Sequence, residues 1–407
     1  MARSSSPASA TSIDVTVIGG AGHVGLPLAL CFASKGMRVL VYDINPASLE
    51  IIGQGKLPFV EYGAEPLLKQ ALADKTLLLS SDPVDIPVGG TLIITIGTPV
   101  DEFLNPVYDS VIGCIDTLLP KITDDSLLIL RSTVFPGTTQ WLDRYLKSHG
   151  KAPKLAFCPE RVVQGHATRE LSEVPQLVSA TTPAAEEAAR KLFSRINPTL
   201  VPLEPMEAEF AKLFSNAYRY IHFAVTNELF MIASSAGVDY HRVLDGMTQD
   251  YPRAQFIPRP GYAAGPCLFK DTMQLAAFSK NQFGLGHAAM LVNEGLVLYV
   301  VDAIRRKHKL ETMTVGILGM AFKADIDDTR ASLSYKMKNT LKMHAGRVLT
   351  TDPFVPRDLD EDILPLETVL KESDLLVLCA PHSAYKDLYV GNKPLVDIWR
   401  FAGDGTL

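Results

Sequence analysis

The sequence reads Val15-Thr16-Val17-Ile18-Gly19-Gly20-Ala21-Gly22-His23-Val24-Gly25 near its start, a β-rich run followed by the glycine spacing G-x-G-x-x-G. The apolar stretch 26–33 comes next and is typical of a helix. Glycines in this pattern allow a tight turn and let backbone N–H groups at a helix start approach a pyrophosphate. The stretch therefore predicts a dinucleotide-binding α/β domain.

A carboxylate stands where this fingerprint needs one. Asp43 ends the next β-rich run about 20 residues on, where it would accept hydrogen bonds from ribose hydroxyls. It would also repel a 2′-phosphate, which favours NAD over NADP. We expect a group of loop residues to line the cofactor site, with His23 lining it rather than acting in catalysis: Gly20, Gly22, His23, Val24 and Gly25. The alternative is a glycine-rich turn in another kind of α/β protein.

The order of patterns along the chain predicts its domains. Strand–helix alternation opens the chain and returns at the end, and it is typical of parallel sheets covered by helices on both faces. Between them, apolar residues recur at helical spacing over 207–236 and about 281–309. We therefore expect an α/β protein with two Rossmann-like parallel-sheet domains joined by a long-helix central domain. The predicted ranges are a disordered tail (1–12), an NAD-binding domain (13–203), a helical central and dimerisation domain (204–309) and a nucleotide-sugar-binding domain (310–407).

Composition limits the function classes. The chain of 407 residues is 47% hydrophobic and 21% charged, with a net charge of −6, so it has no basic excess for nucleic acid or an anionic membrane. Five cysteines without C-x-x-C or Cys/His metal spacing favour a reduced, metal-free protein. The tail lacks an apolar signal segment, and the longest apolar run, 296–304, is about half of the ~20 residues that a membrane span requires. We expect a cytoplasmic protein without nucleic-acid or membrane partners.

The segment Gly261-Tyr262-Ala263-Ala264-Gly265-Pro266-Cys267-Leu268-Phe269-Lys270-Asp271 contains the most informative cysteine. Small residues leave Cys267 without the bulk of a core position. The cation at Lys270 favours a thiolate, and Asp271 can take part in proton transfer. The alternative is a small residue in a tight turn next to an unrelated Lys-Asp pair.

Two polar residues share a face of the first long helical pattern. Lys212 and Asn216 are four residues apart, and Glu209 lies one turn earlier. Phe210, Leu213 and Phe214 indicate that the helix is packed, so polar groups among them need a partner or a function. Lys212 and Asn216 would be suitable donors to an oxyanion. They could instead be ordinary solvated residues.

Several separated motifs together carry a resemblance. With Cys267 and the dinucleotide fingerprint, the chain resembles the UDP-glucose/GDP-mannose dehydrogenase family from residue 13 onward. The further motifs are Gly97-Thr98-Pro99, Arg131-Ser132-Thr133-Val134, Cys158-Pro159-Glu160-Arg161, Glu209-Phe210-Ala211-Lys212-Leu213 with Asn216, Arg219 and Asn227-Glu228-Leu229, and Gly319-Met320-Ala321-Phe322-Lys323 with Asp327-Asp328-Thr329-Arg330.

The resemblance implies NAD-dependent, four-electron oxidation of a nucleotide-sugar C6 alcohol to a uronate through a thioester on Cys267, in a homodimer. It implies Lys212 and Asn216 as oxyanion donors, Asp271 in proton transfer, and Thr133 and Glu160 positioning water or substrate. It places Thr98, Ser132, Thr133, Lys270 and Arg330 at the cofactor. At the nucleotide-sugar it places Glu160, Arg161, Lys212, Asn216, Arg219, Arg253, Tyr262, Gly265, Phe322, Lys323 and Arg400. Arg253, Arg330 and above all Arg400 could instead form ordinary surface salt bridges.

Two departures and three alternative functions accompany the resemblance. Ala264-Gly265-Pro266 replaces the family's usual adjacent glycines followed by Ser or His, and 44–48 lacks the cation that often follows the ribose-binding carboxylate.

The segment 159–165 resembles the branch that acts on UDP-N-acetylhexosamines (UDP-N-acetylmannosamine or UDP-N-acetylglucosamine). UDP-glucose is the first alternative substrate. A two-electron hydroxyacid-type dehydrogenase and a non-catalytic nucleotide-sugar-binding protein are the others.

Overall fold

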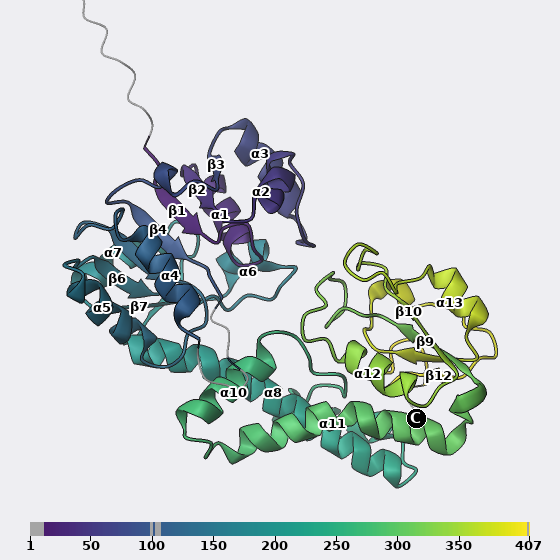
Figure 1. Cartoon of the computed structure of the whole chain (residues 1–407). Coiled ribbons are helices and arrows are strands. Elements are labelled where there is room, and N and C mark those ends of the chain that lie inside the picture. Colours follow the sequence, from purple (N-terminus) through teal and green to yellow (C-terminus); the bar gives the residue numbers. More distant parts are fainter. Residues whose placement is uncertain (1–11, 98–100, 102–106, 405–406) are drawn as a thin grey trace, which may run out of the picture. The chain divides into compact units, whose positions relative to one another are not determined.

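The computed structural model describes residues 12–97, 101, 107–404 and 407. Two compact units divide them: 12–97 with 107–212, and 101 with 213–404 and 407. The predicted tail 1–12 lies outside the described residues except for Ser12. Because each unit has its own sheet and its own core, each is described by itself (Figure 1).

The first unit is built on one large sheet. Its strands lie in the order β3-β2-β1-β4-β5-β6-β7-β8, and β1 pairs in parallel with β2 and β4. The strands are β1 (Val15–Ile18), β2 (Val39–Tyr42), β3 (Leu77–Ser80), β4 (Thr91–Ile94), β5 (Leu127–Leu130), β6 (Lys154–Phe157), β7 (Gln176–Ala180) and β8 (Leu200–Pro202). The helices are α1 (Gly25–Ser34), α2 (Pro46–Gly53), α3 (Ala64–Ala73), α4 (Asp109–Leu118), α5 (Thr138–Ser148), α6 (Ala167–Glu173) and α7 (Pro183–Phe193).

Helices cover both faces of this sheet, as the alternation predicted. Val15 and Val17 point into a core formed with α1, α3, α6 and α7, whereas Ile18 contributes to a core with α4 and α5. One strand pair differs from the prediction, since β6 and β7 are antiparallel. Their connection contains only the seven-residue α6, which packs against α1, so the chain re-enters the sheet in the opposite direction.

The second unit combines long helices with a four-stranded parallel sheet of order β10-β9-β11-β12. Its strands are β9 (Thr314–Leu318), β10 (Arg347–Thr351), β11 (Leu375–Leu378) and β12 (Leu395–Val396). Its helices are α9 (Tyr240–Thr248), α10 (Leu268–Phe278), α11 (Gly284–Lys307), α12 (Leu333–Lys342) and α13 (Leu366–Glu372). The 31-residue α8 (Pro205–Ser235) begins in the first unit and continues into the second after Lys212.

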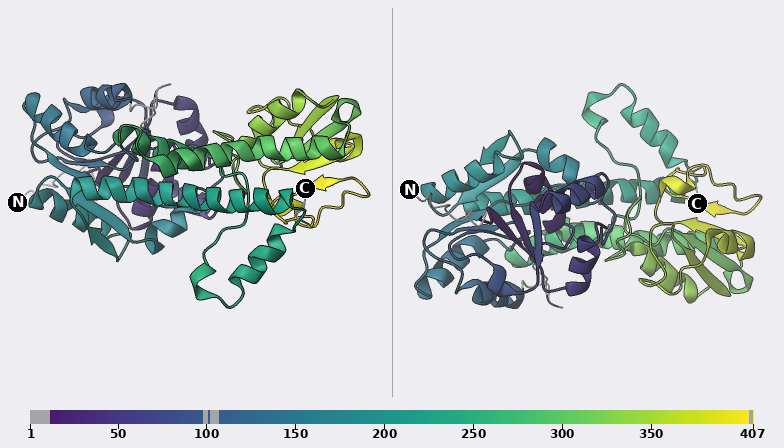
Figure 2. Two further views of the ribbon diagram at one scale, coloured as in Figure 1. Left: turned by 90° about the horizontal axis from the view of Figure 1, so that it is seen from below. Right: turned by 90° about the horizontal axis from the view of Figure 1, so that it is seen from above.

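Within the second unit, α8 and α11 lie side by side (Figure 2). Asn227 of α8 donates to Asn293 of α11 over 2.9 Å, and Asn293 donates to the carbonyl of Tyr220 over 3.0 Å. By length and composition, α11 could cross a membrane. A core helix meets the same criteria, and Leu296, Val300 and neighbouring apolar residues of α11 are buried in the second unit's core, which is consistent with a soluble protein.

Candidate functional site

The loop between β1 and α1 has glycines where larger residues would clash. A Cβ at Gly20 would lie 2.7 Å from the carbonyl oxygen of Val17, and one at Gly25 would lie 2.6 Å from the Cα atom of Gly20. Gly22 has more room, with its nearest neighbour at 3.7 Å. The tight turn therefore depends on Gly20 and Gly25, and the helix behind it presents backbone N–H groups to an anion.

Asp43, at the end of β2, is positioned by this loop. One carboxylate oxygen accepts a hydrogen bond from the Ala21 N–H over 3.0 Å, and the other accepts from the Asn45 N–H over 3.0 Å. The side chain is only partly buried, so its carboxylate keeps lone pairs that ribose hydroxyls can use. The glycine turn and this carboxylate together fit the adenosine half of NAD.

Replacing Asp43 by asparagine is expected to weaken NADH binding by about ten- to a hundredfold, because a charged hydrogen bond contributes about 1.5–3 kcal/mol. NADPH binding should weaken less, since the substitution also removes a negative charge facing the 2′-phosphate. Fluorescence titration with both nucleotides measures the ratio, and Asp82→Asn is the control because Asp82 only caps a short helix at the next strand end. An unchanged NADH/NADPH ratio would contradict the assignment.

His23 contacts two other segments of the first unit. Its ring lies 4.0 Å from the ring of Phe59, and the Gln164 side-chain amide lies 3.1 Å from Nδ1. Glu61, close to Phe59 in the chain, accepts hydrogen bonds from the backbone N–H groups of Gly165 and Thr168. His23 is therefore packed against Phe59 and Gln164, and its place in the cofactor site stays a prediction.

A buried arginine supports the loop that carries Glu160. Arg131 is 1% exposed and donates from one guanidinium nitrogen to the carbonyls of Cys158 (2.8 Å) and Pro159 (3.1 Å) and to Gln176 (2.6 Å). Burial lowers its pKa, while the charge of Glu160 acts in the opposite direction. The sequence placed Arg131 in a motif without giving it a role. Ser132, Thr133 and Glu160 are partly buried beside it, and Thr98 lies outside the described residues.

Cys267 is exposed and immediately precedes the first residue of α10. The N-terminus of a helix stabilises a thiolate through its partial positive charge. Asp271 lies one turn further on and its backbone N–H donates to the Cys267 carbonyl over 2.9 Å, so both residues are on one side of the helix. The Asp271 carboxylate is fully buried and accepts from Asn216 Nδ2 over 2.6 Å, and Lys270 Nζ lies 3.7 Å from its other oxygen. The structure thus brings together Asn216, Lys270 and Asp271.

Lys212 and Glu209 of α8 have different environments. Lys212 is buried, and no carboxylate of the described residues lies within 4 Å of its ammonium group. Glu209 instead caps α5: its carboxylate accepts from the N–H groups of Gly137 (2.6 Å) and Thr139 (2.8 Å) and from the Thr139 hydroxyl. Burial raises its pKa and these hydrogen bonds lower it in part. The sequence suggested that Glu209 shares the side of Lys212 and Asn216, but its contacts are those of a helix cap.

The loop before Cys267 packs against a segment that follows β9. Gly265 has φ of +102°, and a Cβ on it would lie 2.6 Å from the Phe322 ring. Its N–H donates to the Ala331 carbonyl over 3.2 Å. Arg330, close by in the chain, forms a two-pronged pair with Asp328 at 2.9 and 2.6 Å, which raises the pKa of the arginine. Glycine at 265 is therefore required by both the backbone and the aromatic neighbour.

An amide pair that the sequence did not assign holds the start of this loop. Asn227 accepts from the Gly261 N–H and donates to the Gly261 carbonyl, both over 2.9 Å. A Cβ at Gly261 would lie 1.9 Å from the Trp399 ring. The sequence held two signals: the asparagines Asn227 and Asn293 stand within apolar helical patterns, and Asn227 belongs to the motif Asn227-Glu228-Leu229, to which no role was given.

The remaining predicted substrate residues have varied surroundings. Arg253 is exposed and stacks on the Tyr251 ring, while Arg400 forms an ion pair with Asp245 at 3.7 Å. Tyr262 is 4% exposed and packs in the second unit's core, so the structure does not favour its contact with a substrate. Arg219 is exposed, Arg161 donates to the Pro175 carbonyl, and Lys323 is partly buried.

Three consecutive parts of the chain match one family. Residues 13–197 match its NAD binding domain, 206–295 its central domain and 316–403 its UDP binding domain. The chain belongs to the UDP-glucose/GDP-mannose dehydrogenase family. It is an NAD-dependent oxidoreductase that oxidises a nucleotide-sugar to a uronate, as the sequence predicted. The leading resemblance and the α/β architecture are thereby confirmed.

Named relatives span nearly the whole chain. The NDP-N-acetyl-D-galactosaminuronic acid dehydrogenase of Ralstonia nicotianae is 28% identical over 403 residues, covering 93% of this chain and 94% of the relative. The UDP-N-acetyl-D-mannosamine dehydrogenase of Pyrococcus horikoshii is 28% identical over 381 residues, covering 91% and 90%. The solved UDP-D-ManNAc dehydrogenase structure from Pyrococcus horikoshii has a TM-score of 0.86 at 27% identity and covers 94% of each chain.

Proposed function

We propose that the chain oxidises the C6 alcohol of a UDP-N-acetylhexosamine to the carboxylate through a thioester on Cys267. The observation that carries this proposal is the exposed thiol at the N-terminus of α10, with the buried Asp271–Asn216 pair one turn away. A two-electron alcohol oxidation needs no nucleophile, whereas oxidation to an acid through a thioester does. NAD, when bound, takes up the hydride lost at each of the two oxidations, so two NAD+ are consumed per turnover.

Cys267 carries the covalent steps. Its thiolate adds to the C6 aldehyde, forming a C–S bond and leaving a negative charge on the former carbonyl oxygen. Loss of hydride from C6 of the thiohemiacetal leaves the thioester. Water then adds to the thioester carbon, the C–S bond breaks, and the thiolate and the uronate are released. Asp271, hydrogen-bonded to Asn216, is placed one helical turn from the sulfur, where it can relay protons.

The other predicted residues have supporting roles. We assign oxyanion stabilisation to Lys212 and Asn216, because prearranged donors are most effective where negative charge develops. Thr133 and Glu160 would position water or substrate. Ser132, Thr133, Lys270 and Arg330 would contact the cofactor, as would Thr98. Arg161, Arg219, Arg253, Gly265, Phe322, Lys323 and Arg400 would contact the nucleotide-sugar, with Tyr262 supporting the loop from the core.

The sugar is the finer part of the proposal. The segment 159–165 resembles the N-acetylhexosamine branch, and the Ralstonia and Pyrococcus relatives are named for N-acetylated sugars. UDP-N-acetylmannosamine and UDP-N-acetylglucosamine are the preferred candidates, with UDP-glucose as the alternative.

We further propose a cytoplasmic homodimer. Exposed apolar side chains recur along one face of α8, at helical spacing, and would be buried by a second copy: Phe214, Tyr218, Val225, Leu229 and Ile232. The ranges 13–203, 204–309 and 310–407 are our proposed functional domains, and their limits lie close to those of the three family matches.

The proposal predicts two NADH per sugar. Purified protein is supplied with excess NAD and a limiting amount of UDP-N-acetylmannosamine, UDP-N-acetylglucosamine, UDP-glucose or GDP-mannose, and absorbance at 340 nm is followed to completion. We expect a ratio of two with an N-acetylated UDP-sugar and a uronate by mass spectrometry. A ratio of one, with an aldehyde as product, would overturn the thioester route. A ratio of two with UDP-glucose alone would overturn the choice of sugar.

A further inference from the structure

The second unit repeats the carboxylate arrangement of the dinucleotide fingerprint. In the first unit, Asp43 at the end of β2 accepts from Ala21 in the loop after β1 and from Asn45 two residues on. In the second unit, Asp352 at the end of β10 accepts from Ala321, in the segment after β9, over 2.9 Å. It also accepts from Phe354, two residues on, over 2.8 Å. The two carboxylates therefore occupy equivalent positions in two Rossmann-like sheets.

The two carboxylates differ in what else surrounds them. The Asp352 carboxylate is fully buried and also accepts from Met320 N–H (2.6 Å), Val355 N–H (3.0 Å) and His382 Nε2 (3.0 Å). Burial acts to raise the pKa of Asp352, but the hydrogen bond from His382 and those from the backbone outweigh it, and the pKa is lowered. Five donors occupy this carboxylate, so it is not available to a ribose as Asp43 is.

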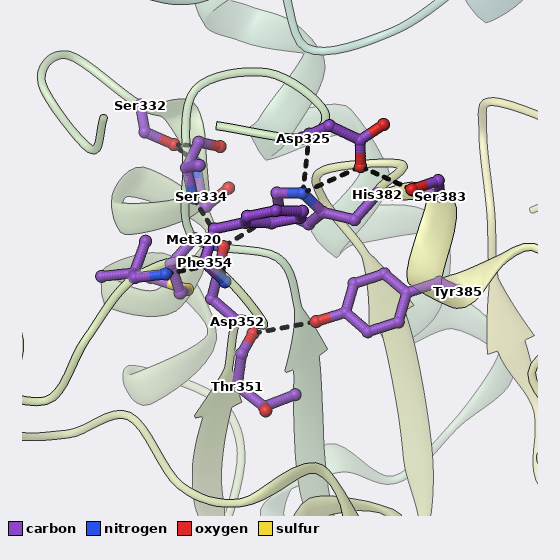
Figure 3. A network of polar contacts seen from close by, with 12 residues as sticks. Met320, Asp325, Ser332, Ser334, Thr351, Asp352, Phe354, His382, Ser383 and Tyr385 are labelled. Carbon is purple, nitrogen blue, oxygen red and sulfur yellow. Dashed lines mark hydrogen bonds and ion pairs between the residues drawn. The ribbon is translucent and has the colours of Figure 1, made fainter. Parts of the chain in front are cut away.

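His382 connects Asp352 to the far end of the same segment (Figure 3). Its Nδ1 accepts from the Asp325 N–H over 2.9 Å, which requires the ring proton to be on Nε2, facing Asp352. The Asp325 carboxylate in turn accepts from the N–H and the hydroxyl of Ser383 at 2.8 and 3.0 Å. His382 is itself 0% exposed. Residues 320–325 are thus fixed at both ends, through Asp352 at the start and His382 with Ser383 at the end.

Phe322 and Lys323 lie between these two anchors. The Phe322 ring also contacts Gly265, two residues before Cys267. A shift of residues 320–325 would therefore move two proposed substrate contacts and one wall of the cysteine loop. A buried imidazole whose two nitrogens are both hydrogen-bonded fixes the position of residues 320–325 more tightly than backbone packing alone.

We propose that His382 is a positioning residue for the nucleotide-sugar: together with Asp352 and Asp325 it holds residues 320–325, and hence Phe322 and Lys323, in the geometry that binds substrate. This inference rests on the proposed roles of Phe322 and Lys323 at the nucleotide-sugar. Asp352, which occupies the position of the ribose-binding Asp43, is in this proposal a structural anchor and does not bind a second dinucleotide.

Three variants distinguish the effect of losing either hydrogen bond of His382 from an effect on the overall stability of the protein. His382→Gln can place an amide N–H near Nε2 and keep the bond to Asp352, but it offers no acceptor to the Asp325 N–H. His382→Asn can place an oxygen near Nδ1 and keep the bond to Asp325, but it loses the one to Asp352. Tyr385→Phe is the matched control: Tyr385 is buried against the His382 ring, and its hydroxyl bonds to the backbone of Thr351 and Gly319, which lie outside residues 320–325.

Hydrogen–deuterium exchange and steady-state kinetics form the test. We expect both His382 variants to raise amide exchange over 320–328 and KM for the nucleotide-sugar about tenfold, which corresponds to one hydrogen bond, while kcat changes less than about twofold. Tyr385→Phe should lower Tm to a similar extent and leave exchange and KM as in the wild type. Unchanged amide exchange in the His382 variants, or an equal rise in amide exchange in Tyr385→Phe, would overturn the proposal that His382 anchors residues 320–325.

The exchange measurement does not depend on turnover. Faster exchange with an unchanged KM, in an enzyme that turns over its sugar, would overturn the positioning role alone. A wild-type protein that oxidises none of the four sugars would contradict the proposed function, whereas the exchange results would still decide whether His382 anchors 320–325.

Discussion

Replacing Cys267 by serine is expected to lower steady-state NADH formation by a factor on the order of a thousand or more, because a hydroxyl at this position cannot replace the thiolate as nucleophile. Cys267 is the exposed cysteine of the five, at the start of α10. Serine has nearly the same size, so Tm and NADH binding should be unchanged. Stopped assays by mass spectrometry should then show no uronate.

The other thiols are poor nucleophiles for a physical reason. Burial raises the pKa of Cys31, Cys114 and Cys158 to about 12, and burial also raises that of Cys379. At neutral pH they are protonated and cannot substitute for Cys267. Cys114→Ser is the matched control, since this thiol is only partly buried, and it should leave turnover intact. A Cys267→Ser enzyme that still formed two NADH per sugar would contradict the thioester route.

Local patterns predicted much of the fold. The glycine fingerprint predicted β1, α1 and the position of Asp43 at the end of the next strand. Apolar periodicity predicted helices over 207–236 and about 281–309, where the structure has α8 (Pro205–Ser235) and α11 (Gly284–Lys307). Such features depend on residues close in sequence, where periodicity and turn chemistry act directly. The direction of β7 was not predictable in this way, because it depends on how the short α6 packs against α1.

Contacts over long sequence separations explain what was missed. Asn227 holds Gly261 from 34 residues away, Glu209 caps α5 from 72 residues away, and His382 meets Asp352 over 30 residues. A lone asparagine, glutamate or histidine has many possible partners, and only the fold selects one. Cys267 and Asp271 could be singled out because they lie within one helical turn of each other, whereas the Asn216–Asp271 bond spans 55 residues and was not predicted. The resemblance implied a separate role for Asn216 and for Asp271.

Lys212 is expected to affect turnover far more than stability. Lys212→Met should lower kcat by about 10²–10³, the usual effect of removing one oxyanion donor. It should leave Tm unchanged or slightly higher, because Lys212 is buried without a carboxylate within 4 Å among the described residues. A buried charge without a partner costs stability, so methionine, of similar length, removes a cost and not a favourable contact.

Lys338 provides a matched comparison for this prediction. It is also buried, but its ammonium group lies 2.8 Å from Asp362, whose pKa it lowers. Lys338→Met should therefore lower Tm and leave kcat of the folded enzyme close to the wild-type value. Thermal unfolding and kcat measured on both variants test the contrast. If Lys212→Met instead lowered Tm and left kcat unchanged, Lys212 would be a packing residue of α8. Oxyanion stabilisation would then have to come from Asn216 and the N-terminus of α10.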